Sequence, residues 1–267
     1  MLMLERDLLV VWAGALGLVV GSGVNALVWR LHEGMSWVRG RSHCSHCGHL
    51  LAARDLVPVV SWIVLGGKCR YCRKSITDGP VVELVAGVVF AWSMWVFYPV
   101  LPGSVLQFGT WLLVTALLLA LAAYDWRWML LPDKLMLPLT MVVAVLAAAS
   151  AIVTSELRVV QGALAAALLG GGAFWLMAAA SRGRAMGGGD IKLAFAMGLL
   201  LGLQGTMVAM FVAFNVAALA GVWLIVTRKR GRRDHIPFGP YLVLGTIVAY
   251  LYGREIVAAY LRLGGID

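Results

Sequence analysis

The sequence predicts an all-α integral membrane protein with about eight transmembrane helices and a small zinc-binding loop domain on its cytoplasmic side. The first observation behind this prediction is composition. Of the 267 residues, 61% are hydrophobic and only 13% are charged, whereas soluble domains carry about 25% charged residues. The second is patterning, because the polar residues gather between apolar runs of about 20 residues, the length that crosses a bilayer.

Eight apolar runs are candidate membrane spans, and we expect the first to be retained as a helix. Residues 1–7 include Glu5, Arg6 and Asp7, so the chain lacks the basic start of a secretory signal. The sixth run is short for a straight crossing. The runs are residues 8–29, 81–98, 105–124, 135–153, 161–180, 191–203, 205–226 and 237–252.

The basic residues predict which loops face the cytoplasm. If the N-terminus lies outside and the spans alternate, 18 of the 22 Lys and Arg residues fall in inside loops. Cytoplasmic loops of membrane proteins are enriched in Lys and Arg, so we expect a multi-pass membrane protein with both termini outside. The formal charge of +9 then requires no nucleic-acid partner.

One segment differs from the rest of the chain in composition. Residues 32–79 are polar and contain all four cysteines and four of the five histidines. We therefore divide the chain into a first transmembrane helix (1–31), a cytoplasmic cysteine-rich domain (32–79) and a larger transmembrane domain (80–267).

The four cysteines form two CxxC pairs, Cys44 with Cys47 and Cys69 with Cys72. This spacing is typical of a zinc site with four thiolate ligands. Such a site is structural, because four thiolates leave no open position for water. Two disulfides or redox thiols are the alternative, which a reducing cytoplasm disfavours. His43, His46 and His49 are additional donors close to the first pair.

Two aspartates stand where apolar spans meet the cytoplasmic face. Asp125 ends the third span, and Asp190 opens the sixth after Gly187, Gly188 and Gly189. Ionisable residues at membrane depth indicate function, and two neighbouring carboxyl groups that share one proton suit peptide hydrolysis. The three glycines would let an extended substrate backbone approach Asp190 closely.

Taken alone, these residues leave other interpretations open. Asp125 could pair with Arg127, Asp133 could cap the fourth span, and Asp190 could cap its helix or pair with Lys192. Asp133 is also a second candidate for catalysis. Membrane carboxylates and glycine breaks occur in ion-coupled transporters as well. A zinc loop could instead be the docking module of an assembly factor without catalytic activity.

The motifs together resemble the bacterial type IV prepilin peptidases, which are bifunctional leader peptidases and N-methyltransferases of pilus and type II secretion systems. The resemblance covers nearly the whole chain. It departs from the family pattern at Ser45, where proline is usual, and at Arg73, where glycine is usual. Besides the CxxC pairs, the segments that carry it are residues 21–31, 58–62, 80–84, 124–133, 187–193 and 238–241.

The resemblance implies that residues 80–267 are an aspartyl peptidase domain. Asp125 and Asp190 would be the catalytic pair, with Asp133, Lys192 and the glycines 187–189 in supporting roles. The substrates would be prepilins or pseudopilins, which lose a short basic leader. The resemblance also implies a location in the bacterial inner membrane, with the active site and the zinc loop facing the cytoplasm.

The resemblance also implies that the new N-terminus is then methylated from S-adenosylmethionine; a peptidase without methylation is the alternative. No sequence pattern locates the methyl-donor site. Glu83, at the start of the second span, is either part of a second site or a structural pairing.

Overall fold

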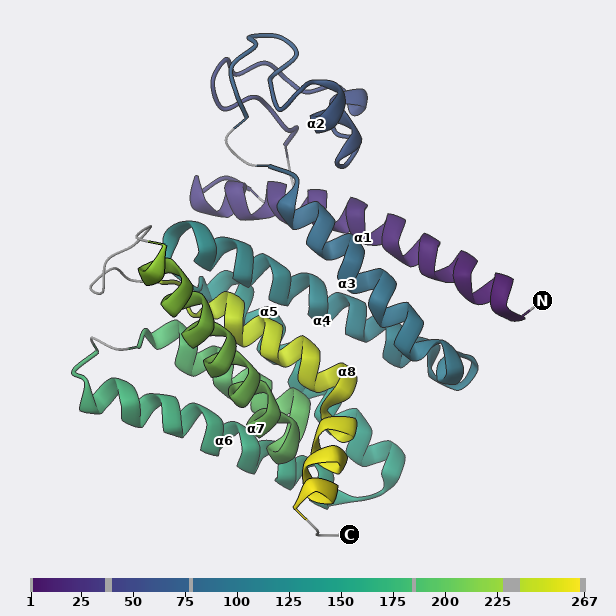
Figure 1. Ribbon diagram of the computed structural model, residues 1–267, viewed down its shortest axis with the longest axis vertical. Coiled ribbons are helices and arrows are strands. Elements are labelled where there is room, and N and C mark those ends of the chain that lie inside the picture. The colour runs from purple at the N-terminus through teal and green to yellow at the C-terminus, as the bar shows by residue number, and fades with distance from the viewer. Residues whose placement is uncertain (1, 37–39, 77–78, 184–185, 228–235, 265–267) are drawn as a thin grey trace. The chain divides into compact units, whose positions relative to one another are not determined.

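The computed structural model describes residues 2–36, 40–76, 79–183, 186–227 and 236–264, and this described part is all-helical (Figure 1). It contains no strand, only two isolated antiparallel bridges. Seven of its helices are long and apolar enough to cross a membrane, so the predicted fold class is confirmed. They are α1 (Leu2–His32), α3 (Val81–Phe97), α4 (Leu101–Trp128), α5 (Asp133–Thr154), α6 (Leu157–Ala180), α7 (Gly188–Val226) and α8 (Gly239–Leu263).

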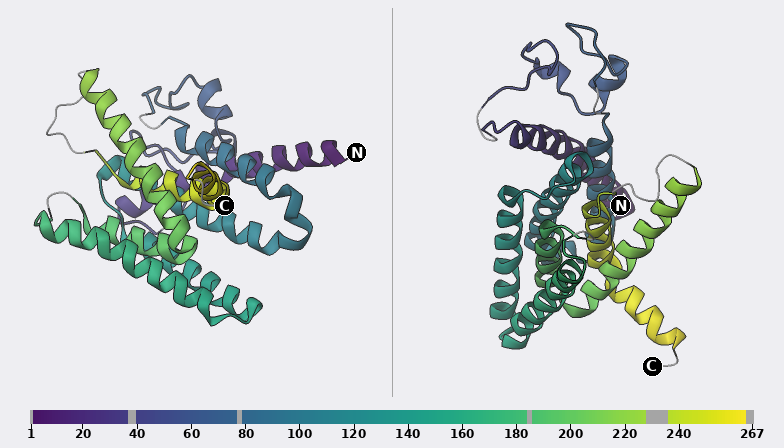
Figure 2. Two further views of the ribbon diagram at one scale, coloured as in Figure 1. Left: turned by 60° about the horizontal axis from the view of Figure 1, so that its bottom comes forward. Right: turned by 90° about the vertical axis from the view of Figure 1, so that its left-hand side faces the viewer.

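The difference between eight predicted spans and seven helices lies in α7. Its backbone is broken at Gly202, where φ is 65° and ψ is −177°. Ala194 O, Thr206 Cγ2 and Met210 Cε all lie 3.3 Å from the place a Cβ would take on Gly170 of α6. A continuous helix would separate residues 194 and 210 by about 24 Å, so the chain reverses at Gly202. The sixth and seventh predicted runs are therefore the two arms of α7 (Figure 2).

The chain divides into two compact units, Met1–Ala123 and Tyr124–Asp267. The first contains α1, α3, most of α4 and the cysteine-rich loop. That loop holds a short helix, α2 (Val60–Val64), and one 3₁₀ turn, Ala53–Asp55; a second 3₁₀ turn, Tyr98–Val100, precedes α4. The second unit contains the last turn of α4 and the helices α5 to α8.

In the first unit, α1 and α3 pack closely through small residues. A Cβ on Gly21 would lie 2.6 Å from the Cα of Glu83, so only glycine permits this approach. Close backbone packing at glycine is the usual way in which membrane helices associate, because lipid gives them little hydrophobic drive. The contact holds the start of α3, and with it Glu83, against α1.

In the second unit, α7 packs against α5, α6 and α8. Helix α4 ends at Trp128, and the next residue, Met129, takes a left-handed conformation with φ 52°. Pro132 is the N-cap of α5. Helix α8 begins at Gly239 with Pro240 in its first turn, where proline is favoured because it loses no backbone hydrogen bond.

Part of the predicted topology falls outside the described residues. The basic group from Arg228 to Arg233, together with Arg39 and Arg184, belongs to segments that the structure does not describe. The cytoplasmic orientation therefore stays a prediction from the sequence.

Candidate active site and metal centre

Asp125 lies in the last turn of α4, and its side chain is buried in the second unit. The residue is only 5% exposed, and its Oδ2 accepts a hydrogen bond of 2.9 Å from the backbone N–H of Gly239. This donor belongs to the first turn of α8, where unpaired N–H groups carry partial positive charge. The bond from α8 fixes the position of the carboxylate. The sequence had suggested Arg127 as an alternative partner for Asp125 and gave no indication of this backbone donor.

The glycine at position 239 is required by this contact. A Cβ there would lie 2.7 Å from Oδ2 of Asp125 and 3.1 Å from its Cγ, closer than carbon and oxygen atoms approach without a bond. Gly239 thus has a definite role: it brings the backbone of α8 up to the carboxylate.

Asp190 lies in the first turn of α7, and its Oδ2 accepts a hydrogen bond of 3.3 Å from the N–H of Gly187. Asp190 therefore caps the start of its own helix, which is one of the alternatives that the sequence left open. Asp190 also interacts electrostatically with Asp125. The fold thus brings the carboxyl group at the end of α4 within electrostatic range of the carboxyl group at the start of α7.

The glycines before Asp190 differ in their surroundings. A Cβ on Gly189 would lie 2.7 Å from the Cβ of Leu131, in the segment between α4 and α5, whereas nothing lies within 4 Å of the same position on Gly188. Gly189 therefore has a packing role. Access of a substrate backbone past Gly187 and Gly188 stays a prediction.

Asp133 and Lys192 form an ion pair with an Nζ–Oδ1 distance of 2.5 Å. Both side chains are largely exposed, 75% for Asp133 and 54% for Lys192. Pro132 is the N-cap of α5, so the expectation that Asp133 caps this helix is wrong. An exposed ion pair contributes about 1 kcal/mol or less to stability. This pair links the first turn of α5 to the first turns of α7 but adds little to the stability of the fold.

The four cysteines converge on one point in the first unit. All four sulfur atoms lie within 4.8 Å of one another, and the Sγ atoms of Cys44 and Cys72 are 3.9 Å apart. Tetrahedral Zn²⁺ with bonds of about 2.3 Å would place its sulfurs roughly 3.8 Å apart. The cluster is thus compatible with a four-thiolate zinc site. The nearby His49 stacks on Tyr71 instead, with ring centroids 3.6 Å apart.

The two CxxC turns share one backbone geometry. Gly48 donates its N–H to Cys44 O at 2.9 Å, and Arg73 donates to Cys69 O at 3.0 Å. Both residues after the second cysteine are left-handed, with φ 70° at Gly48 and 58° at Arg73. Glycine adopts this conformation freely, but an arginine does so only at a cost. The departure from the family pattern at Arg73 therefore places strain in the second turn.

The pKa values of two thiols in the cluster, Cys44 and Cys72, are shifted in opposite directions. Burial opposes ionisation of Cys44, but the N–H groups of Cys47 and His46 and the neighbouring thiols lower its pKa to about 7. The Lys74 N–H favours the thiolate of Cys72, yet burial and three neighbouring thiols raise its pKa to about 11. Four such groups ionise together only when a cation neutralises them, which the metal would do.

The segment between the two turns is held by Asp55, which the sequence did not single out. Its carboxylate accepts hydrogen bonds from Arg70 Nε at 2.6 Å, Tyr71 Oη at 3.0 Å and the Ala52 N–H at 3.1 Å. The Arg70 contact is the main cause that holds the pKa of Asp55 below its usual value. Asp55 thus ties the 3₁₀ turn to the second CxxC turn.

Comparisons with known proteins agree with this architecture. Residues 15–97 match the bacterial peptidase A24 N-terminal domain, and residues 111–224 match the type IV leader peptidase family. A protein of Stutzerimonas stutzeri named prepilin leader peptidase/N-methyltransferase is 32% identical, over 95% of this chain and 94% of its own. The chain belongs to the type IV leader peptidase family. The resemblance inferred from the motifs is confirmed.

Relatives with the same name occur in several bacteria. Proteins with the same name from Pseudomonas aeruginosa and Bacillus subtilis are 32% and 31% identical, and the matches cover 92% and 96% of their own lengths. No solved structure matches the chain.

Proposed function

We propose that this protein is an aspartic endopeptidase that removes the short basic leader from type IV prepilins or type II secretion pseudopilins. Asp125 and Asp190 are the catalytic pair, and they face the cytoplasm. The new N-terminal residue is then methylated. The relatives that carry both activities in their name cover nearly the whole chain, which supports a protein with both.

The observation that carries the peptidase proposal is the buried carboxylate of Asp125, held by the Gly239 N–H beside Asp190. One carboxyl takes a proton from water, and the water oxygen adds to the scissile carbonyl carbon. The other carboxyl donates its proton to the carbonyl oxygen. Collapse of the adduct breaks the C–N bond, and the leaving amine takes up a proton.

The methylation step requires the new amine in its neutral form. Bound S-adenosylmethionine supplies an electrophilic methyl group. The amine nitrogen bonds to that methyl carbon as the bond from carbon to sulfur breaks, and the nitrogen then releases a proton. In the cysteine loop, Cys44, Cys47, Cys69 and Cys72 hold a structural Zn²⁺.

The test is cleavage of a purified short-leader prepilin by the protein in liposomes, with Asp125→Asn, Asp190→Asn and Asp133→Asn compared with wild type. An amide cannot take up and release the proton, so the first two variants are expected to lose cleavage. Asp133→Asn is expected to keep most of it, because it removes only an exposed ion pair.

Retained cleavage in Asp125→Asn or Asp190→Asn, with normal folding, would contradict the catalytic pair. If Asp133→Asn alone abolished cleavage, Asp133 would replace Asp125 in the assignment. If wild type cleaved nothing but moved an ion down its gradient, the transporter interpretation would replace the peptidase.

A further inference from the structure

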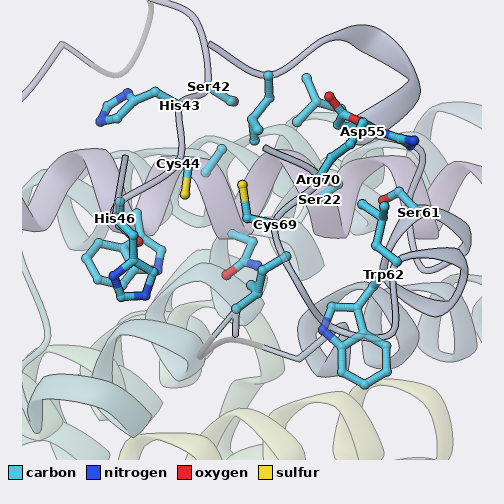
Figure 3. A pocket seen from close by; sticks show the side chains of 18 of the residues that line it. Ser22, Ser42, His43, Cys44, His46, Asp55, Ser61, Trp62, Cys69 and Arg70 are labelled. Carbon is cyan, nitrogen blue, oxygen red and sulfur yellow. The ribbon is translucent and has the colours of Figure 1, made fainter. Parts of the chain in front are cut away.

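Helix α2 in the cysteine loop turns an apolar face outward. Val60, Ile63 and Val64 have the i, i+3, i+4 spacing that places side chains on one face of a helix, and each is more than half exposed. The opposite face carries Ser61 and Trp62, which line a cavity between the loop and the helices α1 and α3 (Figure 3). A surface helix of a soluble domain buries its apolar face and exposes its polar one. In α2 this arrangement is reversed.

The exposed apolar surface extends beyond the helix. Residues 56–67 contain no charged side chain. The carbonyl oxygen of Val57 accepts the N–H of Ser61 at 3.1 Å, so the chain turns into α2 from Val57 onward. Single exposed apolar residues are common, whereas a contiguous group marks an interaction surface. We call this group the α2 patch; its members are Leu56, Val57, Val60, Ile63 and Val64.

A hydrogen bond ties the start of α2 to the first turn of a membrane helix. Glu83 of α3 accepts the N–H of Val59 at its Oε2, with a distance of 2.6 Å; this is the structural pairing that the sequence left open. The apolar span Val81–Val100 has 20 residues, which rise about 30 Å, the thickness of the hydrocarbon core. Its first turn therefore lies at the edge of that core. The bond brings α2 to the same depth, where headgroups meet acyl chains.

The loop that carries the patch is strongly basic. Its only acidic residue between positions 40 and 76 is Asp55, whose carboxylate accepts a hydrogen bond from Arg70. Arg54 and Lys68 are exposed and flank the patch in the sequence. Basic segments beside a bilayer are attracted to anionic headgroups. The six basic residues of this segment are Arg41, Arg54, Lys68, Arg70, Arg73 and Lys74.

We propose that the α2 patch is an interfacial anchor, buried between the headgroups and acyl chains of the membrane that the chain itself spans. The basic residues of the loop contact anionic headgroups. Apolar side chains combined with Lys and Arg are the pattern of segments that lie in a membrane interface. A basic prepilin leader or a second copy of the loop carries charge of the same sign and would be repelled. The proposal does not depend on the peptidase function.

The first test is photo-cross-linking of the purified, zinc-containing protein in nanodiscs of phosphatidylcholine and phosphatidylglycerol. Val64→benzoylphenylalanine places the probe at the most exposed member of the patch. Ultraviolet light is expected to join residue 64 to a lipid acyl chain, which mass spectrometry of the peptide detects. The same probe at Ser75, an exposed residue of the loop outside the patch, is the matched control and is expected to give several-fold less lipid adduct. Equal yields at both positions would overturn the patch as the contact.

Substitutions test the two parts of the anchor separately. Ile63→Asp places a carboxylate among acyl chains, so the lipid adduct at residue 64 is expected to fall about tenfold. Ser75→Asp adds the same charge outside the patch and is expected to leave the adduct unchanged. Arg54→Gln combined with Lys68→Gln is expected to lower the adduct in anionic nanodiscs but not in pure phosphatidylcholine. The zinc content of each variant shows whether its loop is folded.

The second test uses wild type alone, so it does not depend on a variant that folds. Hydrogen exchange of residues 56–64 is expected to slow several-fold when phosphatidylglycerol is added to phosphatidylcholine nanodiscs. Exchange of residues 44–50, in the first CxxC turn, is expected to stay the same. Equal exchange of residues 56–64 in both lipids, without a lipid adduct at residue 64, would overturn the proposal.

Other occupants of the patch would give different adducts. A cross-link from residue 64 to a second copy of the chain, in place of lipid, would assign the patch to self-association. A cross-link to another protein in whole membranes, with no lipid adduct there, would assign it to that partner. Either result would contradict the membrane anchor and leave the peptidase proposal untouched.

Discussion

The cysteine loop of the first unit and the aspartate site of the second assemble distant residues by different means. In the loop, two short turns of the same geometry direct sulfur atoms at one point, and each turn is stabilised by its own backbone hydrogen bonds. At the aspartates, contacts between helix ends far apart in sequence provide the order, above all the bond from Gly239 to Asp125. The loop is thus specified locally, and the aspartate site only by the completed fold.

Removal of the metal should produce the largest effect and should be confined to the loop. A structural zinc contributes about 10 kcal/mol or more in small metal-dependent folds, and the loop has little apolar core of its own. Chelation is expected to abolish protection of residues 40–76 from hydrogen exchange. Protection of α5 to α8 should persist. Loss of that protection as well would contradict the conclusion that the loop and the aspartate site are stabilised independently.

A single added methyl group should disable the aspartate site. Gly239→Ala places a Cβ 2.7 Å from Oδ2 of Asp125, so the carboxylate must move, and a displacement of about 1 Å costs roughly 100-fold in rate. Prepilin cleavage measures the loss. Gly253→Ala on the same helix is the control, because nothing lies within 4 Å of its added Cβ; equal losses in both would point to a general helix effect.

The Asp55 contact predicts how the loop responds to acid. Its pKa is lowered in the folded loop, mainly by the hydrogen bond from Arg70, so its stabilisation is complete above the unfolded pKa of about 3.9. It is lost as the pH falls through the lower folded value. Hydrogen exchange of residues 52–76 in wild type and in Asp55→Asn should therefore differ at pH 6 and begin to converge below about pH 4. A difference that grew as the pH fell would contradict the lowered pKa of Asp55 in the folded loop.

The smallest effect should come from the two turns themselves. Arg73→Gly relieves a left-handed arginine, and it should stabilise the loop by about 1 kcal/mol or less. Gly48→Arg makes the opposite change in the matching turn and should destabilise it by a similar amount. The chelator concentration that releases half the zinc measures both. Changes of the same sign in both variants would mean that the turns are not equivalent.

The difference between the regions also explains what the sequence could predict. Helices and the CxxC cluster follow from hydropathy and local spacing, which depend only on nearby residues. The reversal of α7 was only partly visible, because Gly202 lies in an apolar run without a polar break. The contacts of Asp55 with Arg70, and of Glu83 with Val59, were not predictable, since they join residues without a periodic pattern.

Gly239 shows the same limit at the aspartate site. The segment 238–241 was noticed as a motif, and its glycine followed by proline is a signal for the start of a helix. That signal gave no indication of the carboxylate that the helix would meet. Such a contact becomes visible only when α4 and α8 are placed in space.

The reversal at Gly202 has a consequence for how the enzyme matures. The arm that carries Asp190, from Gly188 to the break, rises only about 21 Å, less than the roughly 30 Å of a hydrocarbon core. Much of this arm is buried in the protein, and Thr206 donates a hydrogen bond of 2.6 Å to the Gly202 carbonyl at the turn. Such an arm enters a membrane stably only when the helices around it enclose it. We therefore expect a nascent or misassembled chain to lack the aspartate pair, so that the proposed catalytic site forms only in chains that have completed folding.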